Sequence, residues 1–84
     1  MSNINIIIQG INGDLRIISI SEEASIQKLK KRVKEAFNLP VDDDIRILYI
    51  TRNLYEVDSH GREQFLKDYQ IGDMALVFIF PRIP

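Results

Sequence analysis

Few residues in this sequence could perform chemistry, since it contains one histidine and no cysteine. His60 follows Asp58 and Ser59 and precedes Gly61. A run of Asp, Ser and His is not a catalytic triad, because those roles require side chains oriented across a fold and an oxyanion hole. We therefore interpret His60 as an exposed loop residue and predict that the chain is not an enzyme.

Two other motifs could hold a charged ligand. Asp42–Asp44 could offer carboxylates to a hard cation, but a calcium loop needs more oxygens at defined spacing and a distal bidentate carboxylate. Gly10 and Gly13 lack the glycine-rich pattern with a lysine that cradles phosphate. The lack of cysteine excludes thiolate zinc sites, iron–sulfur clusters and disulfides. We predict a surface turn at each motif, no metal and no cofactor.

The composition predicts one soluble domain. The chain has 84 residues, with 11 basic and 12 acidic side chains. A net charge of −1 gives no long-range attraction for phosphate backbones, so no nucleic-acid partner is expected. The apolar run Ile4–Ile8 is too short for a signal peptide, and no run approaches the ~18 apolar residues that span a bilayer. We expect an intracellular protein of the cytoplasm, with the nucleus as an alternative, and no membrane partner.

Alternating isoleucines predict a β-hairpin at the start of the chain. In Asn3–Gln9 the even-numbered isoleucines share one face. A turn with two glycines over 10–14 leads into a second β-branched run, Leu15–Ser21.

The second run contains a conflict between its two faces. Leu15 and Ile17 share one face, and Ile18 and Ile20 share the other. A β-bulge would reconcile the two sets, because an extra residue switches the face. Without a bulge we expect Ile18 to be partly exposed.

Apolar residues at spacings of three and four predict a helix after the hairpin. Ser25 can serve as its N-cap, or Ser21 can close the turn before it. The helix is expected to end near Asn38, whose short side chain tolerates the left-handed C-terminal position. The apolar stripe consists of Ile26, Leu29, Val33 and Phe37. The basic residues that fall largely off the stripe are Lys28, Lys31, Arg32 and Lys34. We interpret them as a solvated face, with docking of an acidic partner as the alternative.

The second half of the chain predicts further strands. Ile45–Ile50 is a strong strand, Arg52–Leu54 is a turn into a short strand or irregular stretch, and Met74–Phe80 is the last strand. The order β-β-α-β-(β)-β indicates an α+β fold, with one main helix packed across a mixed sheet of four to five strands.

Three stretches together resemble ubiquitin and its relatives. They are Ser21–Ile26, Asn38–Asp42 and Leu66–Asp73, the last being similar to the family's Leu-x-Asp-Tyr-x-Ile segment. The similarity runs from about Ile4 to Phe80. It implies a ubiquitin-like β-grasp fold in a single domain over residues 1–84, with a core over 3–80 and a tail over 81–84.

The sequence departs from the family pattern at two places. Conjugated relatives end in Gly-Gly, whereas this sequence ends Phe80–Pro84 and contains no Gly-Gly pair. The resemblance therefore implies a non-conjugated member that acts by being bound. Glu56–Gln64 is an insertion relative to ubiquitin. Whether the chain is the N-terminal part of a longer protein stays open.

Alternation along two strands predicts an exposed apolar face. In the strand after the acidic loop, odd-numbered residues are expected to point inward, which leaves Arg46, Leu48 and Ile50 outward. In the last strand we expect the even-numbered residues to point inward and Val77 and Ile79 to point outward. Contiguous exposed apolar residues mark interaction sites, although single exposed aliphatic residues are normal.

The resemblance implies that partners bind this face. Leu48 matches the central apolar position of the family's binding patch, Ile79 the neighbouring one, and Val77 the position of a ubiquitin histidine. Ile11 falls in the first hairpin turn, at the edge of the face. The predicted partner-binding set, which includes two flanking basic residues, is Ile11, Arg46, Leu48, Ile50, Arg52, Val77 and Ile79.

The favoured function is a non-catalytic module bound by protein partners, such as receptors of ubiquitin-like folds. One alternative is a structural subunit of a larger assembly, similar to the small ubiquitin-like components of type VII secretion machinery. Another is a self-associating scaffold, forming a weak homodimer through the same face. Covalent modification and sulfur transfer are argued against by the missing Gly-Gly.

Overall fold

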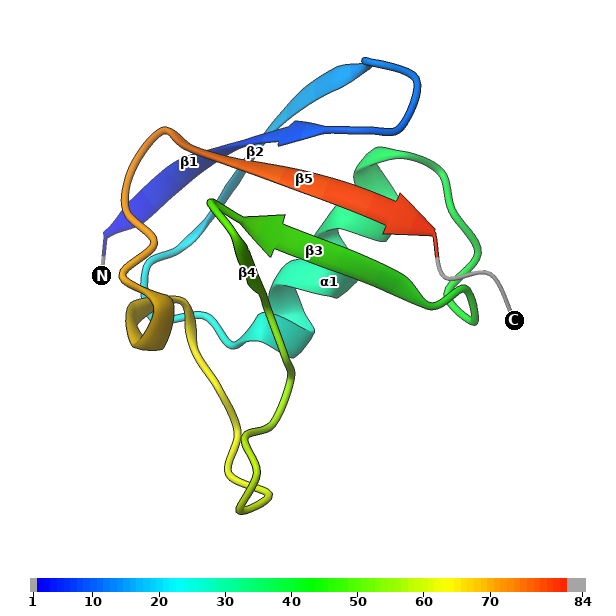
Figure 1. Ribbon diagram of the computed structural model, residues 1–84. Coiled ribbons are helices and arrows are strands. Elements are labelled where there is room, and N and C mark those ends of the chain that lie inside the picture. Colours follow the sequence, from blue (N-terminus) through cyan, green and yellow to red (C-terminus); the bar gives the residue numbers. More distant parts are fainter. Residues whose placement is uncertain (1, 82–84) are drawn as a thin grey trace.

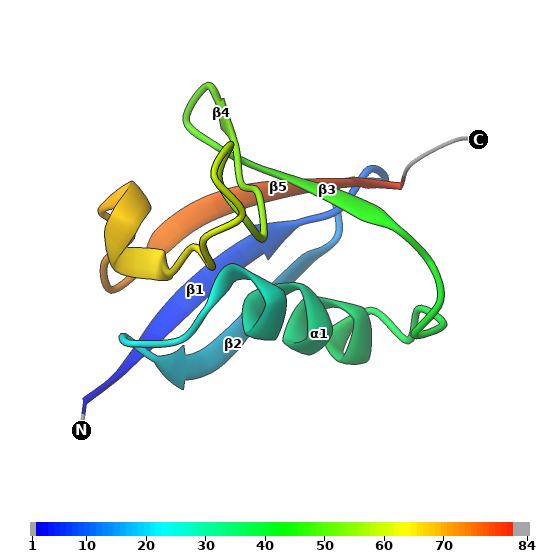
Figure 2. The ribbon, with the colours of Figure 1, turned by 90° about the horizontal axis from the view of Figure 1, so that it is seen from below.

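A computed structural model describes residues 2–81 of the chain as a mixed five-stranded sheet with one α-helix across it (Figures 1 and 2). The elements are β1 (Asn3–Gln9), β2 (Leu15–Ser21), α1 (Ile26–Ala36), β3 (Ile45–Tyr49), β4 (Arg52–Asn53), the 3-10 helix η1 (Leu66–Tyr69) and β5 (Ala75–Pro81). The strand order is β2-β1-β5-β3-β4, in which β1 and β5 are parallel and the other pairs antiparallel. The predicted α+β arrangement is confirmed.

The ends of α1 are fixed by the residues that the sequence indicates. The Ser25 hydroxyl accepts a hydrogen bond from the Lys28 backbone N–H at 3.1 Å, which satisfies one free donor of the first turn. At the other end Asn38 has φ +56°, and the Leu39 N–H donates to the Lys34 carbonyl at 2.8 Å. This left-handed C-terminal motif confirms the predicted end of the helix.

The core lies between α1 and the sheet face that α1 covers. The apolar stripe of α1 is buried at Ile26, Leu29 and Val33, while Phe37 is partly buried. The even-numbered isoleucines of β1 are buried against it, as predicted. The remaining buried residues are Ile18, Ile20, Ile45, Ile47, Leu54, Leu66, Tyr69, Ile71, Val77 and Ile79.

β2 pairs with β1 without a bulge. The register is one-to-one from Asn3 opposite Ser21 to Gln9 opposite Leu15. Ile18 is buried and Ile17 is exposed, so the expectation of a bulge or of partial exposure of Ile18 is wrong. The two sets of apolar residues in β2 occupy opposite faces, because successive side chains of a strand alternate between the faces of the sheet.

β5 has the opposite phase from the one predicted. Val77 and Ile79 are 0% and 6% exposed and belong to the core, so the prediction that they point outward is wrong. The even-numbered residues expected inward instead occupy the other face: Leu76, Phe78 and Phe80. Residues 75–80 are apolar throughout, so alternation carries no phase information. The neighbouring strands set the phase, since Val77 pairs with Ile8 and Ile79 with Ile47.

Hydrogen bonds order the segment between β4 and β5 and join its end to β1. The Tyr69 hydroxyl accepts from the Tyr55 N–H at 3.0 Å, and an Asp68 carboxylate oxygen accepts from the Phe65 N–H at 2.8 Å. The Asp73 carboxylate accepts from the Asn5 N–H at 2.8 Å, which positions the start of β5 beside β1.

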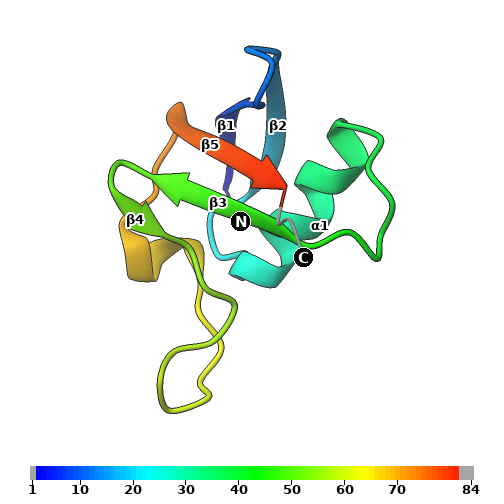
Figure 3. The same cartoon turned by 45° about the vertical axis from the view of Figure 1, so that its right-hand side comes forward.

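Residues 56–64 form a small hairpin that projects from the body of the domain (Figures 1 and 3). One Asp58 carboxylate oxygen accepts from the backbone N–H groups of His60 and Arg62, at 2.8 and 2.9 Å. Gly61 has φ +78°, a conformation that glycine adopts without strain. His60 is exposed, and Asp58 organises the turn through backbone contacts.

Within residues 2–81, no helix is long and apolar enough to cross a membrane. In the same part of the chain, no three His, Asp or Glu side chains lie together in a way that could hold a metal ion.

Candidate interaction surface on the open face of the sheet

The face of the sheet opposite α1 is turned toward the viewer in Figure 1 and is covered by no other element among the described residues. We call it the open face. Its side chains follow from the register. One row across three strands contains Ile17, Ile7 and Leu76. A second row across four strands runs through Leu15, Gln9, Phe78 and Leu48.

Part of the open face is apolar, where an exposed sheet face is normally polar. Its uncharged polar side chains are Asn3, Asn5, Gln9, Ser19, Ser21 and Asn53. Ile17 is 63% exposed, and Leu15, Leu76 and Phe80 also remain exposed. Among the outward residues of the described strands, Arg46 alone carries a charge, and it lies opposite Phe80. The face therefore offers a broad apolar surface with a single guanidinium at one side.

Three residues of the predicted set lie on or beside the open face. Leu48 is half-buried because it lies between Phe78 of β5 and Asn53 of β4. Arg46 is exposed in the same strand. Ile50 follows β3 directly and is 71% exposed. These three placements match the predicted outward positions.

Four residues of the predicted set lie elsewhere. Val77 and Ile79 are in the core, as described above. Ile11 is exposed in the β1–β2 turn, where it lines a pocket of about 300 Å³ together with inner-face residues such as Phe37 and Ile79. The guanidinium of Arg52 lies 4.9 Å from the centre of the Tyr69 ring.

Arg52 is therefore not a rim residue of the open face. It pairs with Tyr49, which has the inward phase of β3, and not with Leu48. A guanidinium over an aromatic ring gains about 0.5–1 kcal/mol at an exposed site, so this contact helps to hold η1 against β4.

Sequence reasoning missed most of the open face. The missed residues are Ile7, Leu15, Ile17, Leu76, Phe78 and Phe80. The sequence did contain a signal for their phase: the alternation of β1 is unambiguous, and any strand paired with β1 must share its inward phase. That signal required knowing that β5 lies beside β1.

The turn between β3 and β4 stores strain next to the open face. Ile50 has φ +62°, although it is β-branched. Such a residue costs roughly 1–3 kcal/mol in the left-handed region, where glycine or asparagine is normal. Strain of this kind is typical of functional positions, and it holds an aliphatic side chain out in solvent beside Leu48.

The arrangement of one helix across a mixed sheet, with the last strand in the middle beside the first, defines a β-grasp fold. A comparison with solved structures shows that it is the ubiquitin-like form. The chain is similar to the ubiquitin-like domain of an Arabidopsis thaliana protein, solved by NMR in solution, with a TM-score of 0.81 and 13% sequence identity. The match covers 100% of this chain and 82% of that chain. The ubiquitin-like fold implied by the sequence is confirmed.

No family model and no curated protein matches this sequence. The fold is therefore established through structure, and the function must be argued from the surface.

Proposed function

We propose that this chain is a non-catalytic interaction domain and that a protein partner binds its open face without covalent linkage. The observation that carries the proposal is an apolar surface that crosses four strands through Ile17, Ile7, Leu76, Phe78 and Leu48. It has exposed residues in both the outer strand β2 and the central strand β5. Exposed apolar patches of a few hundred Å² and more mark interaction sites on soluble proteins.

The chemistry of the surface supports one kind of partner. Two aromatic residues, Phe78 and Phe80, lie in the middle of the sheet, and aromatic residues supply much of the binding energy of interfaces. Arg46 at the side of the face suits a carboxylate on the partner. We therefore propose an apolar partner surface with one acidic residue at its rim, presented by a receptor of ubiquitin-like folds.

Self-association is the second candidate, and the edge strand favours it. β2 lies at the edge of the sheet, carries exposed Leu15 and Ile17 on the open face, and contains neither proline nor a bulge. Edge strands of monomeric proteins are usually protected by such devices. A second copy of the chain is thus an alternative occupant of the same face.

Capture from a cell lysate of the source organism tests the proposal, with Leu48→Arg and Leu76→Arg compared with the unaltered domain. We expect both variants to lose the same partners, because each places a solvated cation in the middle of the apolar surface. The matched control is Val57→Arg, since Val57 is an exposed aliphatic residue in the projecting hairpin, away from the open face. It should retain every partner.

Sedimentation equilibrium separates the two candidates. A monomer that loses partners with Leu48→Arg is the expected result. If the unaltered domain is a dimer and Leu76→Arg dissociates it, the partner at the open face is a second copy of the chain and not a receptor. Partner lists that are identical for all three variants would remove the open face as the site.

A further inference from the structure

Charge is segregated strongly within this nearly neutral chain. α1 contains five basic residues and one acidic residue, a net charge of +4. The whole chain has a net charge of −1, so the residues outside α1 carry a net −5. The solvent side of α1 is therefore a positive surface, on the side of the domain opposite the open face (Figure 2).

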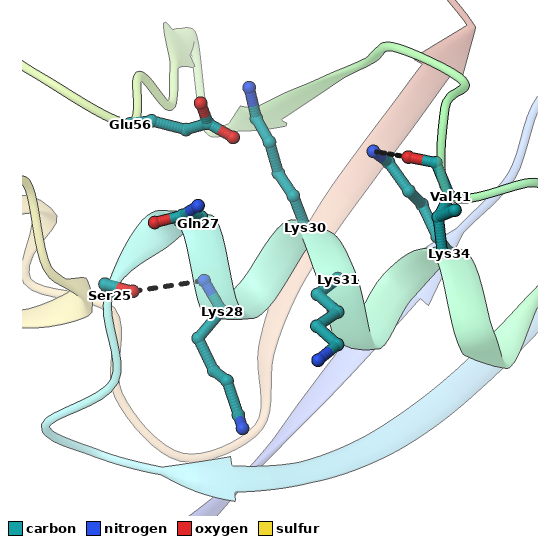
Figure 4. Close-up of a pocket in the computed structure, with 8 residues that line it drawn as sticks. All are labelled: Ser25, Gln27, Lys28, Lys30, Lys31, Lys34, Val41 and Glu56. Carbon is teal, nitrogen blue, oxygen red and sulfur yellow. Dashed lines mark hydrogen bonds between the residues drawn. The ribbon is translucent and has the colours of Figure 1, made fainter.

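Four lysines of α1 line a pocket of about 440 Å³, which is drawn in Figure 4. Its remaining walls come from Val41 in the loop after α1 and from Glu56 at the base of the projecting hairpin. The lining residues are Ser25, Gln27, Lys28, Lys30, Lys31, Lys34, Val41 and Glu56. The pocket could not be predicted from the sequence, because the residues that line it are up to thirty-one positions apart in the chain.

Among residues 2–81, none of the four lysine ammonium groups of the pocket lies at ion-pair distance from a carboxylate. Lys34 donates to the Val41 carbonyl at 3.1 Å, and Arg32 pairs with Glu35 at 3.7 Å. Within residues 2–81, Lys28, Lys30 and Lys31 have no carboxylate at ion-pair distance.

The arrangement destabilises the isolated helix. Lys28 and Lys31 are three residues apart, and Lys30 and Lys34 are four residues apart. Like charges at these spacings each cost about 0.2–0.5 kcal/mol. A polar uncharged residue would solvate the helix equally well without that cost. An anionic ligand would remove the repulsion.

The positions of the ammonium groups indicate the shape of that ligand. Figure 4 shows Lys30 extending to the side of Glu56, while Lys28 and Lys31 project toward the other side of α1. The groups do not converge on one point, which argues against a single small anion. They suit several carboxylates spread along an extended segment.

Two walls of the pocket restrict the ligand further. Val41 is 74% exposed and, with the aliphatic parts of the lysine side chains, forms an apolar wall. Glu56 places a carboxylate at one side, which repels a uniform polyanion. The net −5 of the surrounding residues also opposes nucleic acid and anionic membranes.

We propose that this pocket binds an acidic peptide segment of a partner protein, with carboxylates on Lys28, Lys30 and Lys31 and an apolar side chain against Val41. The site is independent of the open face. A partner with an acidic tail, or two different partners, can therefore occupy both sides of the domain at once.

Fluorescence polarisation at low salt tests the site in the 84-residue chain. The probe is a short fluorescein-labelled peptide of aspartate and glutamate with interspersed leucines, and its control replaces every acid by the corresponding amide. We expect only the acidic peptide to bind, with an affinity that falls as salt screens the charges. Equal binding of the amide peptide, or binding that salt leaves unchanged, would overturn the proposal.

The decisive variant is the double substitution Lys28→Glu and Lys31→Glu. Binding should weaken by about tenfold or more, since two favourable charge contacts become repulsive. The variant should still fold, because an acidic residue is favourable in the first turn of a helix, Lys28→Glu completes a capping box with Ser25, and both substituted side chains are exposed. A rise in the thermal midpoint together with loss of binding would separate function from stability.

Controls define what counts as failure. Lys67→Glu with Arg62→Glu makes the same change in net charge on residues that do not line the pocket, and should leave binding within about twofold. Glu56→Gln should strengthen binding, and Val41→Ser should weaken it. An equal loss in the Lys67 and Arg62 variant would show non-specific attraction. If single-stranded DNA or phosphatidylserine vesicles bind more tightly than the acidic peptide, the proposal of a peptide ligand is overturned in favour of those ligands.

Discussion

Both faces of this sheet carry large apolar side chains, but α1 covers only one of them. β5 illustrates the contrast, because Val77 and Ile79 are buried beneath α1 while Leu76 and Phe80 are exposed on the open face. The hydrophobic effect favours burial of both pairs, but only Val77 and Ile79 are removed from water. The difference teaches that an apolar residue in a strand indicates a surface that some other group covers. Only the topology tells whether that group is an element of the same chain or a partner.

The largest expected effect comes from placing a carboxylate on each face of β5. Val77→Asp should leave the domain unfolded, because an unpaired buried charge costs several kcal/mol, a large part of the stability of a small domain. Leu76→Asp should remain folded, because its carboxylate stays in water. Circular dichroism and an amide NMR spectrum of both variants provide the measurement. A folded Val77→Asp and an unfolded Leu76→Asp would reverse the assigned phase of β5.

A smaller change on β2 sharpens the same contrast. Ile18→Ala should lower the free energy of unfolding by about 2–5 kcal/mol, because it opens a cavity in the core. Ile17→Ala, at the neighbouring position on the open face, should change it by at most about 0.5 kcal/mol. Urea denaturation measures both. Similar losses at the two positions would indicate that the open face is covered, for instance by a second copy.

A third change concerns the helix that makes the two faces different. Ser25→Ala removes the acceptor for the Lys28 N–H and should reduce the free energy of unfolding by about 1 kcal/mol. Ser59→Ala in the exposed hairpin is the matched control and should have little effect. Partner capture through the open face should be the same for both variants. A loss of capture with Ser25→Ala alone would mean that binding depends on α1 as well as on the open face.

How much the sequence predicts depends on how local each feature is. The caps of α1 were predicted at Ser25 and Asn38, because capping is set by neighbours a few residues away. The phases of β1 and β3 were predicted because polar residues mark the outward positions, Asn5 and Gln9 in β1 and Arg46 in β3. The phase of β5 was wrong, because it is set by contact with Ile8 and Ile47, which are distant in the chain.

The candidate site shows the same division. Leu48 and Arg46 were placed correctly from the alternation of their own strand. The position of Arg52 was wrong, because its contact is with Tyr69 across the fold. Some residues of the open face are thus placed by the local pattern of their own strand, and others by the way the strands are arranged. Only the first group could be predicted from the sequence.

The smallest expected effect lies at the strained turn beside the open face. Ile50→Gly removes the roughly 1–3 kcal/mol cost of a positive φ but loses about 0.5–1 kcal/mol because glycine gives the unfolded chain more entropy. The two effects partly cancel, and the net free energy of unfolding should rise by about 1 kcal/mol. Thr51→Gly in the same turn has no such strain to relieve and should lower stability instead. Thermal unfolding of the two variants tests the sign.

The same pair of variants connects strain to function. If the Ile50 side chain contributes to the proposed interface, Ile50→Gly should weaken partner capture while it raises the thermal midpoint, and Thr51→Gly should leave capture unchanged. Opposite signs for stability and binding at one residue are expected where a strained conformation is retained for binding. Unchanged capture with Ile50→Gly would confine the interface to the strands, and the open face would then end at Leu48.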